Sequence, residues 1–252
     1  MTIDFPKIPQ IPQLRQLWQQ AFGDSNAFLD DFFATGFSPN RCRCITHNKN
    51  IIAALYWFDG AYTGGKIAYL YAVATHQKYR HQGFCRILME DTHRLLTSFG
   101  YAAAVLVPGN NELFTFYEKM GYRPFGGIRK FSCTSSAQDI PLRQISLAEY
   151  IESRRQYLPT GGVLQEDAAL IFLETQATFY AGEDFLFVAS QNGSALYTPE
   201  LLGNPDVAPH ILHTFGAAEG LFRTPGTDPF AMYLPLTNPA PPPPSYFGLA
   251  LD

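Results

Sequence analysis

The sequence contains no apolar run long enough to span a bilayer and no cluster of basic residues. Its 18 Lys and Arg residues are spread thinly and are outnumbered by 22 Asp and Glu, so the formal net charge is −4. A protein that binds a phosphate backbone or an anionic membrane usually carries clustered positive charge. The composition therefore argues against nucleic acid and membranes as partners.

Cysteine is also scarce, and the four cysteines form no metal-binding or disulfide pattern. Cys42, Cys44, Cys85 and Cys133 include no CxxC pair. Cys42 and Cys44 would share one face of a strand, but no histidine or second cysteine pair accompanies them, which favours ordinary packing over a metal site. Residues 1–20 lack the basic start, apolar run and small-residue cleavage site of a signal peptide. We expect a soluble cytoplasmic protein with reduced thiols and no metal.

The length and apolar content predict two domains. At 252 residues, with 46% hydrophobic and 15% aromatic residues, the chain holds enough apolar material for more than one core. Residues 134–141 are polar and without periodicity, as in a linker. We expect one domain over residues 1–133 and a second, smaller α+β domain over residues 142–252.

The hydrophobic pattern of the first 133 residues predicts the order α-α-β-β-β-α-β-α-β, which describes an α+β fold with a mixed central sheet flanked by helices. The helices are expected near residues 11–22, 25–33, 84–99 and 111–120, and the strands near 41–47, 51–58, 67–75, 102–107 and 122–133. In the helix after Gly83, the expected inward face consists of Phe84, Ile87, Leu88, Leu95 and Phe99.

The second half shows its own start and turn signals. Ser146 with Glu149 forms a capping box for a helix that ends near residue 158, and residues 165–178 favour a second helix. Asn192-Gly193 lies between two strand-like runs, which is the favoured sequence for a hairpin turn. A short helix is expected near 208–215, and the runs FAMYLPL and YFGLAL predict two closing strands on either side of a proline-rich loop.

The stretch with the clearest chemistry is the turn from Arg80 to Cys85, between a predicted strand and a predicted helix. Gly83 allows the backbone to approach a ligand, and the start of the helix presents unpaired N–H groups at the positive end of its dipole. A pyrophosphate fits such a site, and Arg80 adds a planar donor suited to phosphate oxygens. Taken alone, one Arg and one Gly between a strand and a helix favour a plain connection over a binding site.

The order of the neighbouring motifs resembles the GNAT superfamily of acyl-CoA-dependent N-acyltransferases. The signature of that family is a strand followed by R/Q-x-x-G-x-G/A and a helix, and here Arg80 and Gly83 match while Cys85 replaces the last Gly or Ala. The family's later N-x6-Y motif is matched by Asn110 and Tyr117, followed by EKMGY. The resemblance covers roughly the first half of the chain.

The resemblance implies which residues would contact each part of a bound acetyl-CoA. Backbone groups of Ala72, Val73 and Ala74 would bind the pantetheine arm. The pyrophosphate site would consist of Arg80, His81, Gln82, Gly83, Phe84 and Cys85, with Asn110 also near the cofactor. Tyr117 stands where the family places a general acid, which would return a proton to the leaving thiolate. The alternative for Tyr117 is a core aromatic on a helix face.

The phrase YAVATHQKYRHQGF also resembles the two-domain branch related to the enhanced-intracellular-survival acetyltransferases. In that branch a second, degenerate acetyltransferase-like unit follows the catalytic one, and here no R-x-x-G-x-G/A occurs in the second half. The strand IAYLYAVAT lacks the carboxylate that serves many relatives as the base. The terminal carboxylate of Asp252 is one candidate for that role, because members of the branch place their C-terminus in the active site.

The sequence thus predicts an N-acetyltransferase that moves an acetyl group from acetyl-CoA directly to a primary amine of a small molecule or peptide. The acceptor and the oligomeric state are left open. A non-catalytic acyl-CoA-binding regulatory module is the alternative, and aminoacyl transfer of the peptidoglycan type is a weaker one.

Overall fold

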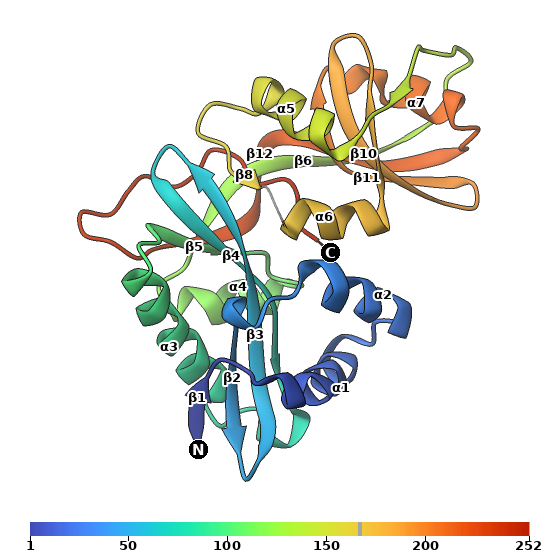
Figure 1. Cartoon of the computed structure of the whole chain (residues 1–252). Coiled ribbons are helices and arrows are strands. Elements are labelled where there is room, and N and C mark those ends of the chain that lie inside the picture. Colours follow the sequence, from blue (N-terminus) through green and yellow to red (C-terminus); the bar gives the residue numbers. More distant parts are fainter. Residues whose placement is uncertain (166–167, 252) are drawn as a thin grey trace.

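The computed structural model describes residues 1–165 and 168–251. It is a mixed α+β fold in which the described strands form a large sheet that helices flank (Figure 1). The strands are β1 (Thr2–Asp4), β2 (Cys42–His47), β3 (Asn50–Tyr62), β4 (Gly65–Thr75), β5 (Ala103–Leu106), β6 (Arg123–Thr134), β7 (Arg143–Gln144), β8 (Leu164–Gln165), β9 (Thr178–Ala181), β10 (Phe185–Asn192), β11 (Ala195–Gly203) and β12 (Glu219–Pro235). The helices are α1 (Ile11–Phe22), α2 (Asn26–Asp31), α3 (Phe84–Ser98), α4 (Asn111–Glu118), α5 (Leu147–Tyr157), α6 (Ala168–Gln176) and α7 (Ala208–Thr214).

The first half follows the predicted order of helices and strands. Strands β2, β3 and β4 form an antiparallel meander, and β5 pairs with β4 in parallel. Side chains of β3 alternate between the two faces of the sheet, as the period of two requires. Leu55 and Trp57 belong to the core beneath α3 and α4, whereas Tyr56 and Phe58 belong to the core beneath α1, α2 and α6.

Strand β12 connects the two halves of the sheet. It pairs antiparallel with β6 from Glu219–Thr134 to Tyr233–Arg123. On its other edge, it pairs with β11 at its beginning and with β5 at its end. The last strand of the second half therefore completes the sheet of the first half, and the division at residues 134–141 stays a prediction.

Helix α3 buries a different face from the predicted one. Ile87 and Phe99 are 37% and 50% exposed, whereas Leu88, Thr92 and Leu96 line up four residues apart on the buried side. The pattern from sequence was misleading because Thr92 is polar. Its hydroxyl donates to the carbonyl of Leu88 at 2.8 Å, which satisfies the group inside the core.

In the second half, local signals were accurate and two segment assignments were wrong. The capping box of Ser146 and Glu149 and the hairpin of β10 and β11 are both present. Gln165 ends strand β8 instead of starting a helix. The segment YFGLAL, residues 246–251, forms no strand, although it is buried. Its apolar residues pack against the core. Side chains of Gln165 and Arg223 donate to the carbonyls of Leu249 and Gly248, and the backbone N–H of Val163 donates to the carbonyl of Tyr246.

No helix in the described part of the chain is both long and apolar enough to cross a membrane.

A fully buried ion pair lies between α5 and β11. The Arg154 guanidinium donates to both carboxylate oxygens of Glu200, at 2.7 and 3.0 Å, and neither side chain is more than 1% exposed. The hydroxyls of Tyr150 and Tyr246 also donate to Glu200, at 2.5 and 2.9 Å. The carboxylate is thus fully hydrogen-bonded, which is what makes its burial tolerable.

We expect Arg154→Ala to lower the free energy of unfolding by about 3–5 kcal/mol, because it leaves the Glu200 charge buried without its partner. Urea unfolding followed by circular dichroism measures this loss. Arg155→Ala, at an exposed position of the same helix, is the matched control and should change stability by no more than about 0.5 kcal/mol. Equal effects of the two substitutions would contradict the account of the ion pair.

Candidate active site

A bulge interrupts strand β4 at the residues predicted to bind a cofactor. The pairs Tyr56–Tyr71 and Ala54–Ala74 leave two residues of β4, Ala72 and Val73, opposite one residue of β3. Ala72 has a φ of +47°, which is uncommon for a residue other than glycine. Such bulges end strand pairing and redirect backbone groups, often beside active sites.

Strands β4 and β5 separate just before this bulge. Their parallel pairing covers Ile67–Ala103 to Tyr69–Val105 and goes no further. Beyond it, residues 70–73 of β4 and residues 106–109 after β5 line a cavity of about 430 Å³, called here the central cavity. Tyr117 of α4 and Leu113 line it as well. The separation of two neighbouring strands thus opens the sheet to a ligand.

The turn before α3 has the geometry of an anion site. His81 and Gly83 adopt left-handed φ values of +62° and +82°, and Gly83 is the N-cap of α3. No side chain caps the first N–H groups of this helix. A Cβ built on Gly83 would have no atom within 4 Å, so the space above the turn is open. Free N–H groups and the dipole of α3 both favour a phosphate here.

The polar side chains of this turn partly serve to hold its shape. Arg80 donates from Nε to the carbonyl of Thr75 at 3.1 Å, and Gln82 donates from Nε2 to the carbonyl of Lys78 at 3.0 Å. His81 is exposed, and Phe84 packs against the core beneath α3. Arg80 is exposed and lies in the segment between β4 and α3.

Tyr117 is buried, and its hydroxyl has no hydrogen-bond partner among the described residues. Its ring packs against Phe116 and Tyr122, with centroids 5.2 and 5.8 Å apart. Burial, with a smaller contribution from the Cys85 thiol, raises the pKa of Tyr117 above its ordinary value. The hydroxyl is therefore protonated at neutral pH and lies at the wall of the central cavity.

Cys85 replaces the expected small residue of the turn but does not obstruct it. Its side chain packs against the core beneath α3, close enough to Tyr117 and Tyr122 to influence both phenols. Burial raises the pKa of the Cys85 thiol to about 11. A thiol that stays protonated is a poor nucleophile, so the site offers no relay through this cysteine.

Comparison with known families identifies the domain that contains this arrangement. Residues 3–125 match the family described as Acetyltransferase (GNAT) domain. This stretch of the chain is a GNAT acetyltransferase domain. No curated protein matches the sequence.

Solved structures share the fold over both halves of the chain. A GCN5-related N-acetyltransferase from Kribbella flavida has 16% identity and a TM-score of 0.72, and the match covers 95% of this chain and 72% of that one. One from Anabaena variabilis has 18% identity, a TM-score of 0.72 and coverage of 94% and 73%. Eis from Mycobacterium abscessus has 10% identity, a TM-score of 0.66 and coverage of 94% and 74%. At these identities the likeness concerns the fold.

Asn110 and Ala74, two further predicted cofactor residues, also have structural partners. Asn110 caps α4, since its side-chain oxygen accepts from the N–H of Leu113 at 3.0 Å. Ala74 is buried and pairs with Ala54 after the bulge, whereas Ala72 and Val73 line the central cavity. Tyr117 lies beside the same cavity, in the last turn of the helix that Asn110 caps.

Several residues that line the central cavity could not be recognised from the sequence. Trp18, Phe22 and Phe28 read as core residues of amphipathic helices, yet they form one wall of the cavity, and Phe22 is 47% exposed. Asp24 carries the only carboxylate among the described residues of the lining, and its Oδ2 accepts from Trp18 Nε1 at 2.7 Å. Aromatic residues at helical spacing predict packing, so only the fold could reveal the wall.

The end of the described chain also reaches the central cavity. Leu251 lines it, and the Leu251 carbonyl accepts from the Tyr71 hydroxyl at 2.7 Å. Asp252, predicted from sequence as a candidate base, lies outside the described residues, and its role stays a prediction.

We expect Cys85 to resist alkylation in the folded protein. With a pKa of about 11, only about 0.1% of the thiol is ionised at pH 8, and the rate with iodoacetamide should rise about tenfold per pH unit toward pH 11. Peptide mapping by mass spectrometry measures labelling at this residue. The same reaction in urea is the control and should be fast, and rapid labelling of the folded protein at pH 8 would refute the assignment.

Proposed function

We propose that the chain is an acetyl-CoA-dependent N-acetyltransferase that transfers the acetyl group directly to a primary amine of a small molecule or peptide. The observation that carries the proposal is the arrangement along β4: an anion-binding turn follows the bulge, and an unpartnered tyrosine hydroxyl lies beside the same cavity. A long ligand with an anionic part and a reactive end fits this arrangement.

The pyrophosphate, the pantetheine arm and the thioester of acetyl-CoA would each have a counterpart in the GNAT domain. The N–H groups at the start of α3, with the open space at Gly83, would bind the pyrophosphate. Backbone groups of Ala72 and Val73 would bind the amides of the pantetheine arm, because the bulge removes them from regular pairing with β3. The thioester would then lie in the central cavity near Tyr117.

The transfer needs no covalent intermediate on the protein. The amine nitrogen attacks the thioester carbonyl, the carbon–sulfur bond breaks, and the thiolate of coenzyme A leaves. The amine loses a proton to a carboxylate or to solvent, and the thiolate gains one from Tyr117. Cys85 takes no part, because burial keeps its thiol protonated.

Burial raises the pKa of Tyr117 and keeps its hydroxyl protonated at neutral pH, as a proton donor must be. In water, proton transfer from a phenol to a thiolate is unfavourable, because the phenol has a higher pKa than the thiol. The same cavity that raises the pKa of the phenol also destabilises the leaving thiolate, so the two values rise together. Hydrogen bonding from the phenol stabilises charge on sulfur as it develops.

Binding of acetyl-CoA should raise the melting temperature, as a ligand at 100 times its Kd stabilises the folded state by about 2.7 kcal/mol. Gly83→Asp should abolish this rise, because it places a negative charge where the pyrophosphate binds. Gly100→Asp is the matched control: Gly100 follows α3, has a φ of +77° and equally open surroundings, so strain and charge are alike but the position differs. A rise retained in Gly83→Asp would refute the cofactor site.

Tyr117→Phe should keep the acetyl-CoA-dependent rise in melting temperature and lower kcat by about 10²- to 10⁴-fold, because it removes the proton donor but keeps the ring. Tyr122→Phe is the control, since that hydroxyl bonds to His93 at 2.8 Å instead of lining the cavity. Release of coenzyme A, followed with a thiol reagent, measures turnover. Acetyl-CoA binding without turnover on any amine would favour the non-catalytic acyl-CoA-binding module.

A further inference from the structure

A second cavity adjoins the central cavity on the side of the second half. It has a volume of about 210 Å³ and lies between α2, α6 and strands β10 and β11. Phe28, Phe172 and Leu173 form its aromatic and aliphatic wall, and Ser190 and Tyr197 lie on the strand side. We call it the side cavity.

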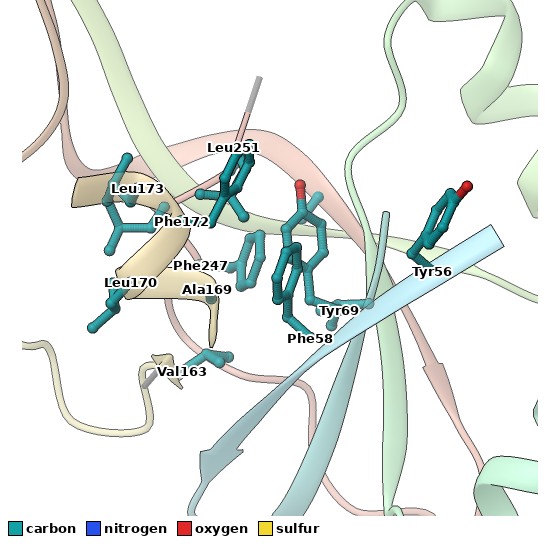
Figure 2. Close-up of a cluster of buried hydrophobic side chains, with 14 of the residues drawn as sticks. Tyr56, Phe58, Tyr69, Val163, Ala169, Leu170, Phe172, Leu173, Phe247 and Leu251 are labelled. Carbon is teal, nitrogen blue, oxygen red and sulfur yellow. The ribbon is translucent and has the colours of Figure 1, made fainter. Parts of the chain in front are cut away.

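The two cavities share walls. Phe28 of α2 and Leu251 line both of them, so the two cavities are neighbours. Figure 2 shows Leu251 between the α6 side chains Phe172 and Leu173 and the tyrosine ring of Tyr69. An acceptor that occupied both cavities would therefore contact Phe28 and Leu251.

The side cavity is uncharged. None of its described lining residues carries a charge, and the polar groups that line it are hydroxyls and the amide of Gln176. The Gln176 amide is itself held by Asp31, at 2.9 Å. In the central cavity, Asp24 is the only charged residue of the described lining. The described walls of the two cavities together carry one negative charge, that of Asp24. One carboxylate suits an acceptor with one ammonium group better than an acceptor with several.

From this we infer that the acyl acceptor is a monoamine on an apolar, aromatic-sized body, which occupies the side cavity while its amine enters the central cavity. The inference rests on the proposed function. The volume fits the body, since an apolar protein cavity of about 150 Å³ holds a benzene molecule. Burial of the ring against Phe172 and Leu173 would supply the binding energy, and the single carboxylate of Asp24 would attract the amine.

The far end of the side cavity leaves room for a longer body. Ser190 and Tyr197 also line an open hollow of about 500 Å³ on strands β6, β10, β11 and β12. Its described lining combines apolar side chains with hydroxyls, the Asn192 amide and the Glu219 carboxylate. A substituent on the ring opposite the amine would extend into it.

The test compares acceptors with acetyl-CoA as donor. 2-Phenylethylamine and tryptamine should have kcat/KM values about 10- to 100-fold above that of ethylamine, the same amine without a ring. Spermidine and kanamycin, which carry several ammonium groups, should fall below 2-phenylethylamine. A preference for the polycations, or no advantage from the ring, would overturn the inference.

Substitutions that fill the side cavity test whether the ring of the acceptor binds there. Ala177→Trp, directly after α6, should remove the advantage of 2-phenylethylamine over ethylamine while ethylamine is turned over as before. Glu174→Trp is the matched control, because Glu174 is exposed on the same helix and does not line the cavity. Ser190→Trp fills the cavity from the opposite wall. It provides a second test in case Ala177→Trp does not fold. An advantage that survives in both folded variants would overturn the inference.

Calorimetry separates this inference from the proposed function. With the protein saturated by coenzyme A, 2-phenylethylamine should bind to the wild type and to Glu174→Trp but not to Ala177→Trp. Such binding without any acetyl transfer would support the side cavity and refute the transferase. Absence of binding, with acetyl-CoA still raising the melting temperature, would refute the side cavity and leave the cofactor site standing.

Discussion

The ladder between β6 and β12 is the constraint on which the rest of the structure depends. It runs from Glu219–Thr134 to Tyr233–Arg123, and the residues of β12 that end it also pair with β5. A slip by one residue would turn every side chain of β12 to the other face of the sheet. The register therefore fixes Met232 and Tyr233 in the two opposite cores and holds the halves in one arrangement.

That arrangement determines where the last residues of the chain lie. Figure 2 shows Phe247 and Leu251 between α6 and the aromatic side chains Phe58 and Tyr69 of β3 and β4. Carbonyls of this segment accept hydrogen bonds from several elements: Leu249 from Gln165 at 2.6 Å, and Leu251 from Tyr71 at 2.7 Å. Buried backbone oxygens are thus satisfied without a strand, so the segment keeps an irregular path. The second half acts on the site by holding this segment at the central cavity.

Local features of the fold were predictable because they depend on neighbouring residues. The glycine turn at Gly83, the Ser146 capping box and the Asn192-Gly193 hairpin each follow from a side chain and the backbone within a few positions. The role of Tyr117 as general acid was implied by the resemblance to the GNAT family and stays a prediction, while the residue itself lines the central cavity.

Features that depend on distant parts of the chain were not predictable. Nothing in the sequence of β5 indicates that β12 will pair with it, because the residues of a strand do not specify which other strand pairs with its edge. Residues 246–251 have the composition of a buried strand, and burial is what the composition correctly indicated. Phe28 reads as a core residue for the same reason, although it lines both cavities.

The pairing of β5 with β12 also bears on the order in which the protein forms during synthesis. Leu106 of the GNAT domain pairs with Met232, which is synthesised 126 residues later. At about 5–20 residues per second, one edge of β5 stays unpaired for about 6–25 seconds. An open strand edge invites pairing with other chains, so the nascent acetyltransferase domain is exposed to aggregation until its own last strand arrives.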